Sequence, residues 1–278
     1  MNLPKMEETR IDGATLETID KGSGEPVVLI HGSMGDECFA MLEEPALTES
    51  HRLIHYHRRG WGADGCPEAP VSMEQQSLDC QALLAHLGVS QAHFVGQSYG
   101  AAISLQVALD VPDLVHSLSL LEPPLMAVLS ESAEFGAVAE KAGSQYEGGS
   151  KEDAVETFGR AVAGADYRAE FDKTLPAGST DRWIAKADTL FRSDLAALTP
   201  WSFTREDAGR ITRPTLNMTG ANTASFFREA HETVKTWMPH AESYVVPDAT
   251  HAMMQTNPKA TAERLAAFLG RNPISRSG

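Results

Sequence analysis

The sequence contains no long apolar run. Nowhere in its 278 residues do about 18 consecutive apolar residues occur, the length that a membrane-spanning helix needs. The opening residues, MNLPKMEETRIDG, also lack the apolar stretch that a signal peptide requires. We therefore expect no membrane partner and a cytoplasmic location.

Cysteine is scarce. The chain has only Cys38, Cys66 and Cys80, an odd number whose spacing fits no metal-binding motif. Free thiols are typical of a reducing compartment. The three cysteines therefore predict neither a disulfide framework nor a metal site.

Basic residues are also few compared with acidic ones. The chain carries 23 Lys and Arg against 38 Asp and Glu, a formal net charge of −15. Such a surface repels phosphate backbones and anionic lipids, so we expect no nucleic-acid partner. Hydrophobic residues make up 42% and charged residues 22%, as in ordinary folded domains, and the length allows a large core without disulfides.

Short apolar runs recur along the chain and predict buried strands. The runs are Pro26–Ile30, Leu53–Tyr56, His93–Val95, Leu118–Leu121, Thr215–Met218 and Tyr244–Val246. Helix-like stretches separate most of them, among them Ser72–Leu87, Ala101–Leu109 and Pro258–Leu269. We expect Ser72 to cap the first stretch and Gly88 to end it, and Gly270 to end the last one. This alternation predicts an α/β fold with a mostly parallel sheet. The alternating segment Arg10–Asp20, followed by the turn KGSGEP, predicts an antiparallel hairpin at the sheet edge.

The strand pattern stops between residues 123 and 204, where helix-forming residues dominate. Candidate helices are Glu131–Lys141, Lys151–Ala163 and Asp181–Ser193, with loops at 143–150 and 175–180. Because strands resume at Thr215, we expect a helical cap (123–204) inserted into one core (1–122 and 205–278).

The sharpest motif is GQSYG at 96–100, which lies between a strand-like run and a helix-like run. A serine nucleophile on a tight strand-to-helix turn needs small residues two positions before and after it, and Gly96 and Gly100 supply them. The motif predicts Ser98 as a nucleophile. The helix that follows directs its first amides toward Ser98, so we expect Tyr99 N–H to stabilise an oxyanion.

A serine hydroxyl needs a base whose proton affinity suits neutral pH, which favours histidine. Of the ten histidines, His251 follows a strand-like YVV and the loop PDAT and precedes the last helix. We therefore expect His251 to act as the general base. The loop HGSMG at 31–35 follows the first buried run, so it is expected to provide the second oxyanion amide, either Ser33 or, in a different loop register, Met34.

Together, HGSMG, YHRRGWG at 56–62, GQSYG and PDATH before a terminal helix resemble the α/β-hydrolase superfamily over nearly the whole chain. The resemblance implies an eight-stranded sheet with helices on both faces, a helical cap after the sixth strand and a Ser-His-acid triad that needs no metal or organic cofactor. Relatives that act as dehalogenases or epoxide hydrolases carry aspartate where this chain has Ser98. His57 stands where the family usually has aspartate, which is expected to change a structural hydrogen-bond network.

The acid of the triad departs from the commonest family pattern. The residues after the strand TLNMTG are ANTA, without a carboxylate. Some superfamily members place the acid at the end of the sixth strand, where this chain has Glu122, so we expect Glu122 to orient His251. Two alternatives remain open: Glu122 could be a surface residue or pair with Arg58 or Arg59, or Asp248 could be the acid.

The segments LLEPP and GANTASFF also resemble the zearalenone-type lactone hydrolases locally. We expect hydrolysis of a carboxylic ester or lactone of a small apolar molecule through an acyl-enzyme. Within the same fold, the alternatives are hydrolysis of a carbon–carbon bond and ligand binding without catalysis. A homodimer stays open, because nothing in the sequence identifies an interface.

Overall fold

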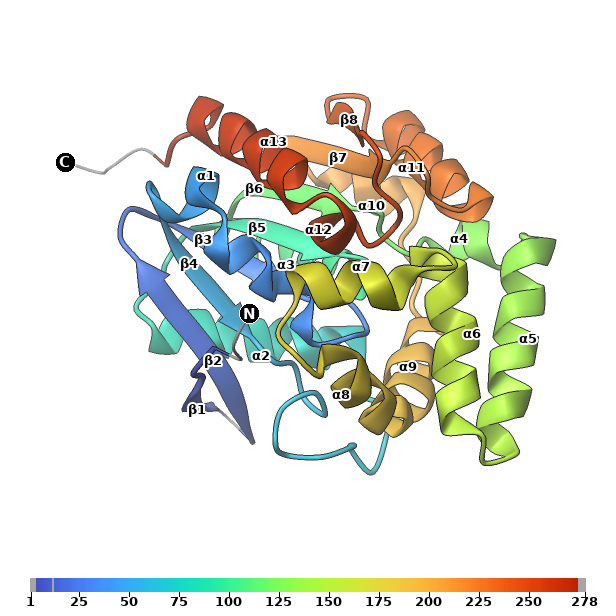
Figure 1. The fold of residues 1–278 in the computed structure, drawn as a ribbon. Helices are drawn as coiled ribbons and strands as arrows, with labels where there is room; N and C mark the ends of the chain where they lie inside the picture. Colours follow the sequence, from blue (N-terminus) through green and yellow to red (C-terminus); the bar gives the residue numbers. More distant parts are fainter. Residues whose placement is uncertain (1–3, 12, 275–278) are drawn as a thin grey trace.

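The computed structural model describes residues 4–11 and 13–274. The strands in this part of the chain form one eight-stranded sheet (Figure 1). They are β1 (Glu7–Ile11), β2 (Ala14–Gly22), β3 (Glu25–Ile30), β4 (His51–Tyr56), β5 (Ala92–Gln97), β6 (Val115–Leu121), β7 (Thr215–Gly220) and β8 (Glu242–Val246). All six predicted apolar runs lie in strands β3 to β8.

The strand order is β1-β2-β4-β3-β5-β6-β7-β8. Strands β1 and β2 form the expected antiparallel hairpin at the sheet edge, although β1 already begins at Glu7. Strand β2 is also antiparallel to β4, and every other neighbouring pair is parallel. This is the mostly parallel α/β-hydrolase sheet that the sequence predicts.

Both faces of the sheet are buried, which explains the continuous apolar runs. Along β3, Val28 and Ile30 join one apolar cluster, while Val27 and Leu29 join the other. Helices α2 (Met73–His86), α3 (Tyr99–Asp110), α10 (Arg205–Arg210) and α11 (Ser225–Trp237) contribute to the first cluster. Helices α1 (Pro45–Thr48), α12 (Met253–Thr256) and α13 (Pro258–Arg271) contribute to the second, together with the short helices η1 (Asp36–Phe39) and η2 (Met41–Glu43).

The predicted ends of α2 are confirmed, whereas the predicted end of α13 is wrong. Ser72 caps α2 because its side chain accepts a hydrogen bond from Gln75 N, and Gly88 has the positive φ that follows many helices. Helix α13 does not stop at Gly270 but continues to Arg271. An added Cβ at Gly270 would meet no atom within 4 Å, so nothing in its surroundings requires a turn there.

Between β6 and β7 the chain leaves the sheet and forms a group of helices, which Figure 1 shows on one side of the molecule. Apart from α10, which packs into the first apolar cluster, they are α4 (Met126–Leu129), α5 (Ala133–Glu147), α6 (Lys151–Ala163), α7 (Tyr167–Thr174), α8 (Ser179–Ala185), the π-helix η3 (Thr189–Asp194) and α9 (Leu195–Leu198). We call this segment the helical insertion. Within the described residues, no helix of the protein is long and apolar enough to cross a membrane.

Three local predictions in the helical insertion are wrong. Residues 143–147 belong to α5 rather than to a loop, because α5 packs along α6 and this packing outweighs the helix-propensity cost of Gly143, about 1 kcal/mol. The expected single helix Asp181–Ser193 is interrupted after Ala185 and continues as η3. Helix α7 was not expected, and it is held by the burial of Tyr167 and Phe171.

Candidate active site

Ser98 occupies a sharp turn between β5 and α3. Its backbone has φ 53° and ψ −120°, a conformation that costs a non-glycine residue about 1–3 kcal/mol. The turn is held by the bond from Ser98 N to the carbonyl of Leu121, and by close packing at the flanking glycines. An added Cβ at Gly96 would overlap Gly100, and one at Gly100 would overlap the carbonyl of Ile30.

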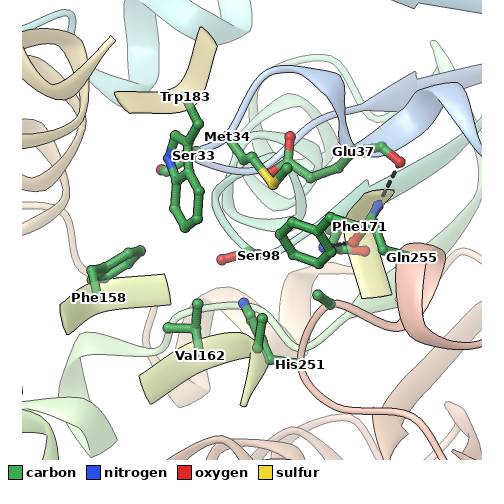
Figure 2. A pocket seen from close by; sticks show the side chains of 13 residues that line it. Ser33, Met34, Glu37, Ser98, Phe158, Val162, Phe171, Trp183, His251 and Gln255 are labelled. Carbon is green, nitrogen blue, oxygen red and sulfur yellow. Dashed lines mark hydrogen bonds between the residues drawn. The ribbon is translucent and has the colours of Figure 1, made fainter. Parts of the chain in front are cut away.

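The loop HGSMG lies directly against this turn. A Cβ added at Gly32 would lie 3.1 Å from the Cβ of Ser98. The neighbouring Ser33 and Met34 line the same cavity as Ser98 (Figure 2). The structure therefore places both predicted oxyanion residues of this loop beside the serine, and Tyr99 follows Ser98 as the first residue of α3.

His251 lies in the loop between β8 and α12, and its side chain reaches the cavity next to Ser98 (Figure 2). Its Nδ1 is 2.5 Å from Oε2 of Glu122. The ring of Phe227 stacks on the imidazole, with the centroids 3.6 Å apart and the planes 7° from parallel. These two contacts fix the orientation of the ring, and Nδ1 faces the carboxylate.

Glu122 directly follows β6, has a positive φ of 49° and is fully buried. Besides His251, its carboxylate accepts hydrogen bonds from the Thr219 hydroxyl, the Gly220 amide and the Thr223 hydroxyl. Burial disfavours the charged form, but the bonds from His251, Thr219 and an amide outweigh it and hold the pKa of Glu122 below its usual range. Glu122 is thus kept as an anion behind the imidazole.

The two alternatives for the acid are not supported by the geometry. Arg58 bonds to Asp194, and Arg59 bonds to Asp79. Asp248 is exposed, although it too has a positive φ. The segment after β7, where the common family pattern has an aspartate, instead supplies Thr223 as a donor to Glu122, and the end of β7 supplies Thr219. Sequence reasoning missed these threonines, because hydroxyl donors of this kind carry no motif.

Three aromatic side chains of the helical insertion close the cavity over Ser98: Phe158, Phe171 and Trp183 (Figure 2). The indole of Trp183 also donates to the carbonyl of Ser33, which ties α8 to the HGSMG loop. The ring of Phe171 packs against that of Tyr167, with the ring centroids 5.4 Å apart. The walls of the cavity are therefore mostly apolar.

A buried ion pair between Asp194 and Arg58 lies next to the HGSMG loop and ties the helical insertion to the core. Both terminal nitrogens of the Arg58 guanidinium donate to the carboxylate of Asp194, which belongs to η3. Asp194 also accepts hydrogen bonds from the Ser33 hydroxyl and from the indole of Trp61. Single π-helical turns recur at functional sites, and this one directs a carboxylate to the candidate oxyanion loop.

Glu37 is a second buried carboxyl at the cavity, and sequence reasoning missed it as well. Burial raises its pKa to about 8. Its backbone carbonyl accepts a hydrogen bond from the side-chain Nε2 of Gln255, so the η1 segment is linked to α12, which follows His251. One oxygen, Oε2, lies 3.8 Å from His31 Nδ1.

His57 lies between two carboxylates, and that it changes the family's usual hydrogen-bond network stays a prediction. Its Nδ1 lies 3.0 Å from Glu17, and its Nε2 lies 3.5 Å from Asp36. Burial opposes protonation of the ring, but the neighbouring carboxylates of Asp36 and Glu17 outweigh it and raise the pKa of His57. Within residues 4–11 and 13–274, no group of three or more His, Cys, Asp or Glu residues could hold a metal ion.

A family described as the alpha/beta hydrolase fold matches residues 25–258. The chain belongs to this family. A relative from Pseudomonas putida, the dihydrolipoyllysine-residue acetyltransferase component of an acetoin cleaving system, is 34% identical over 120 residues. That match covers 42% of this chain and 32% of the relative, so it spans about a third of the relative's length.

Solved structures show the same fold across the chain. An enzyme that degrades N-acyl homoserine lactones superposes with a TM-score of 0.77 and 21% identity, covering 95% of this chain and 100% of that one. A carboxylesterase from Bacillus subtilis has a TM-score of 0.74 and 16% identity, covering 95% of this chain and 90% of its own. At these identities the likeness concerns the fold.

Proposed function

We propose that this member of the α/β-hydrolase family is a serine hydrolase that cleaves a carboxylic ester or lactone of a small apolar molecule. The observation that carries the proposal is the contact of His251 Nδ1 with the buried carboxylate of Glu122, while the same His251 shares one cavity with Ser98. Such an arrangement turns a weakly nucleophilic hydroxyl into an acyl acceptor.

In the first step, the Ser98 Oγ attacks the carbonyl carbon of the substrate while His251 takes the hydroxyl proton. The carbonyl electron pair moves onto its oxygen, and the backbone amides of Ser33 and Tyr99 stabilise that oxyanion. Glu122 stabilises the imidazolium that forms. When the tetrahedral intermediate collapses, the alcohol leaves with the proton from His251, and an acyl group remains on Ser98.

In the second step, His251 takes a proton from water, and the oxygen of the water attacks the acyl carbon. Collapse of this second intermediate returns the proton to Ser98 and releases the carboxylic acid. For a lactone, the alcohol and the acid are two ends of one product. Each step uses side chains and amides of this chain only, so the proposal includes no metal and no organic cofactor.

The structural neighbours support an ester-type bond, because one degrades lactones and another is a carboxylesterase. The apolar walls formed by Phe158, Phe171 and Trp183 support an apolar substrate. Hydrolysis of a carbon–carbon bond and ligand binding without turnover would use the same residues. Product analysis and active-site labelling separate these alternatives from ester hydrolysis.

The test is mass spectrometry of the protein after incubation with a fluorophosphonate, which labels activated serines. We expect one label on the wild type, none on Ser98→Ala and slower labelling of Glu122→Ala. Circular dichroism of each variant confirms that it folds. A folded wild type that stays unlabelled would favour the binding protein, and equal labelling of Glu122→Ala would reject Glu122 as the acid.

A further inference from the structure

The cavity that holds Ser98 and His251 is small. It encloses about 40 Å³. A water molecule takes roughly 10–15 Å³ of such space, so the cavity holds only a few waters. An ester carbonyl fits beside Ser98, but a larger substituent needs additional space.

A second cavity of about 300 Å³ lies inside the helical insertion. Helices α4, α5, α6 and α9 and the π-helix η3 line it, and Figure 1 shows α5, α6 and α9 at one end of the molecule. Apart from Thr199, the side chains that line it in the described part of the chain are apolar or absent, as in glycine. This second cavity has the volume and character of a site for an apolar group.

Phe158 on α6 lines both cavities. Figure 2 shows its ring at the edge of the Ser98 cavity, on the side of Val162 and away from Gln255. The ring is only partly buried, and it contacts Trp183 with a centroid distance of 6.4 Å. One side chain therefore forms the boundary between the serine and the second cavity.

Specific side-chain contacts hold the walls of the second cavity in place. Phe191 of η3, which lines it, stacks on Tyr146 of α5 with the ring centroids 4.7 Å apart. The hydroxyl of Tyr146 donates to Asp188, which also binds Lys151. On the α5 side, Gly143 leaves open space, because a Cβ added there would meet no atom within 4 Å.

From these contacts we propose that the second cavity is the subsite for a slender, unbranched apolar chain on the ester or lactone held at Ser98, with Phe158 at its entrance. The inference rests on the proposed function and names its substrate class. A chain is favoured over a ring system because the substituent must pass Phe158. None of the described residues that line the cavity is charged, so an acid or an amine would find no partner among them.

The test compares p-nitrophenyl octanoate with p-nitrophenyl acetate, and octyl acetate with ethyl acetate. Each buried methylene contributes about four-fold to binding, so the wild type should favour the long chain in at least one pair. Gly143→Leu fills the cavity with a better helix former. It should lower kcat/KM for the favoured long ester at least tenfold and leave the short ester within about twofold.

Gly136→Leu is the matched control, because it lies on the same helix, has equally open space at its Cβ and does not line the cavity. It should leave both esters unchanged. If Gly143→Leu lowers long and short esters alike, or changes neither, the chain binds elsewhere and the proposal is wrong.

Titration calorimetry with octanoic acid separates failure of this subsite from failure of the proposed function. If the wild type hydrolyses no ester yet binds the acid, and Gly143→Leu but not Gly136→Leu weakens binding at least tenfold, the subsite stands and hydrolysis fails. If the wild type hydrolyses no ester and the acid binds equally to all three proteins, or to none, the subsite is rejected as well.

Discussion

His251 Nδ1 lies 2.5 Å from Glu122 Oε2, although 129 residues separate the two in the chain. The pairing depends on the order of strands β6, β7 and β8, which are neighbours in the sheet. Glu122 directly follows the first of these strands, and His251 lies in the loop after the third. Because the three strands are parallel, their carboxyl ends lie at the same edge of the sheet, and both side chains lie there.

Glu122→Gln should lower kcat by about 10³–10⁴ with little change in KM, because an amide cannot stabilise the imidazolium that forms in the transition state. Steady-state kinetics with a p-nitrophenyl ester measures the effect. Asp248→Asn is the control, since this neighbouring carboxylate is exposed. A Glu122→Gln enzyme with wild-type kcat would show that another residue supports His251.

Thr223→Val should lower kcat about tenfold, because it removes a 2.9 Å hydrogen bond to Glu122 while keeping the shape of the side chain. A bond to a charged group contributes about 1.5–3 kcal/mol. Thr223→Ser restores the hydroxyl and should recover most of the rate. A loss that serine does not rescue would indicate a packing effect and not support of Glu122.

Much of this geometry could be predicted from sequence, because it follows from local patterns. The strands β3 to β8 contain short apolar runs, and glycines two residues before and after Ser98 indicate the turn there. Glu122 was predicted as the acid because the segment ANTA lacks a carboxylate and Glu122 ends an apolar strand. The structure shows it next to His251, while its catalytic role stays a prediction.

What could not be predicted depends on contacts between distant segments. The end of α5 is set by packing on α6, which overrides Gly143, and the π-helix η3 has no sequence signature. In the sequence, nothing distinguishes Asp194 from the other acidic residues of the predicted helices. In the structure it binds Arg58, which lies 136 residues earlier in the chain. Such partners are chosen by the tertiary fold, and single-sequence patterns do not encode them.

Asp194→Asn should lower the free energy of unfolding by about 3–5 kcal/mol, because it leaves the buried charge of Arg58 without its counter-ion. Urea unfolding followed by circular dichroism measures the change. Asp188→Asn is the matched control, since Asp188 forms a more exposed ion pair with Lys151 and should cost less than about 1 kcal/mol. Equal losses in both variants would contradict a special role for the buried pair.

The last prediction concerns the buried carboxyl of Glu37, whose pKa is raised to about 8, first by burial. Arg58 lowers this pKa, whereas the nearby carboxylates Asp36 and Asp194 raise it. His31 lies close to the same carboxyl, and burial lowers its own pKa well below the usual value, so it adds no positive charge at neutral pH. We therefore expect Glu37 to be protonated in the folded protein at pH 7.

Glu37 should make the protein less stable as pH rises from about 4.5 to 8, because the unfolded chain loses this proton first and the folded state keeps it. The loss approaches roughly 5 kcal/mol, at about 1.4 kcal/mol per pH unit, and stops above the folded pKa. Urea unfolding between pH 5 and 9 should show this decline in the wild type and in the exposed control Glu43→Gln, but not in Glu37→Gln, which cannot ionise. Parallel curves for all three proteins would mean that Glu37 is already ionised in the fold.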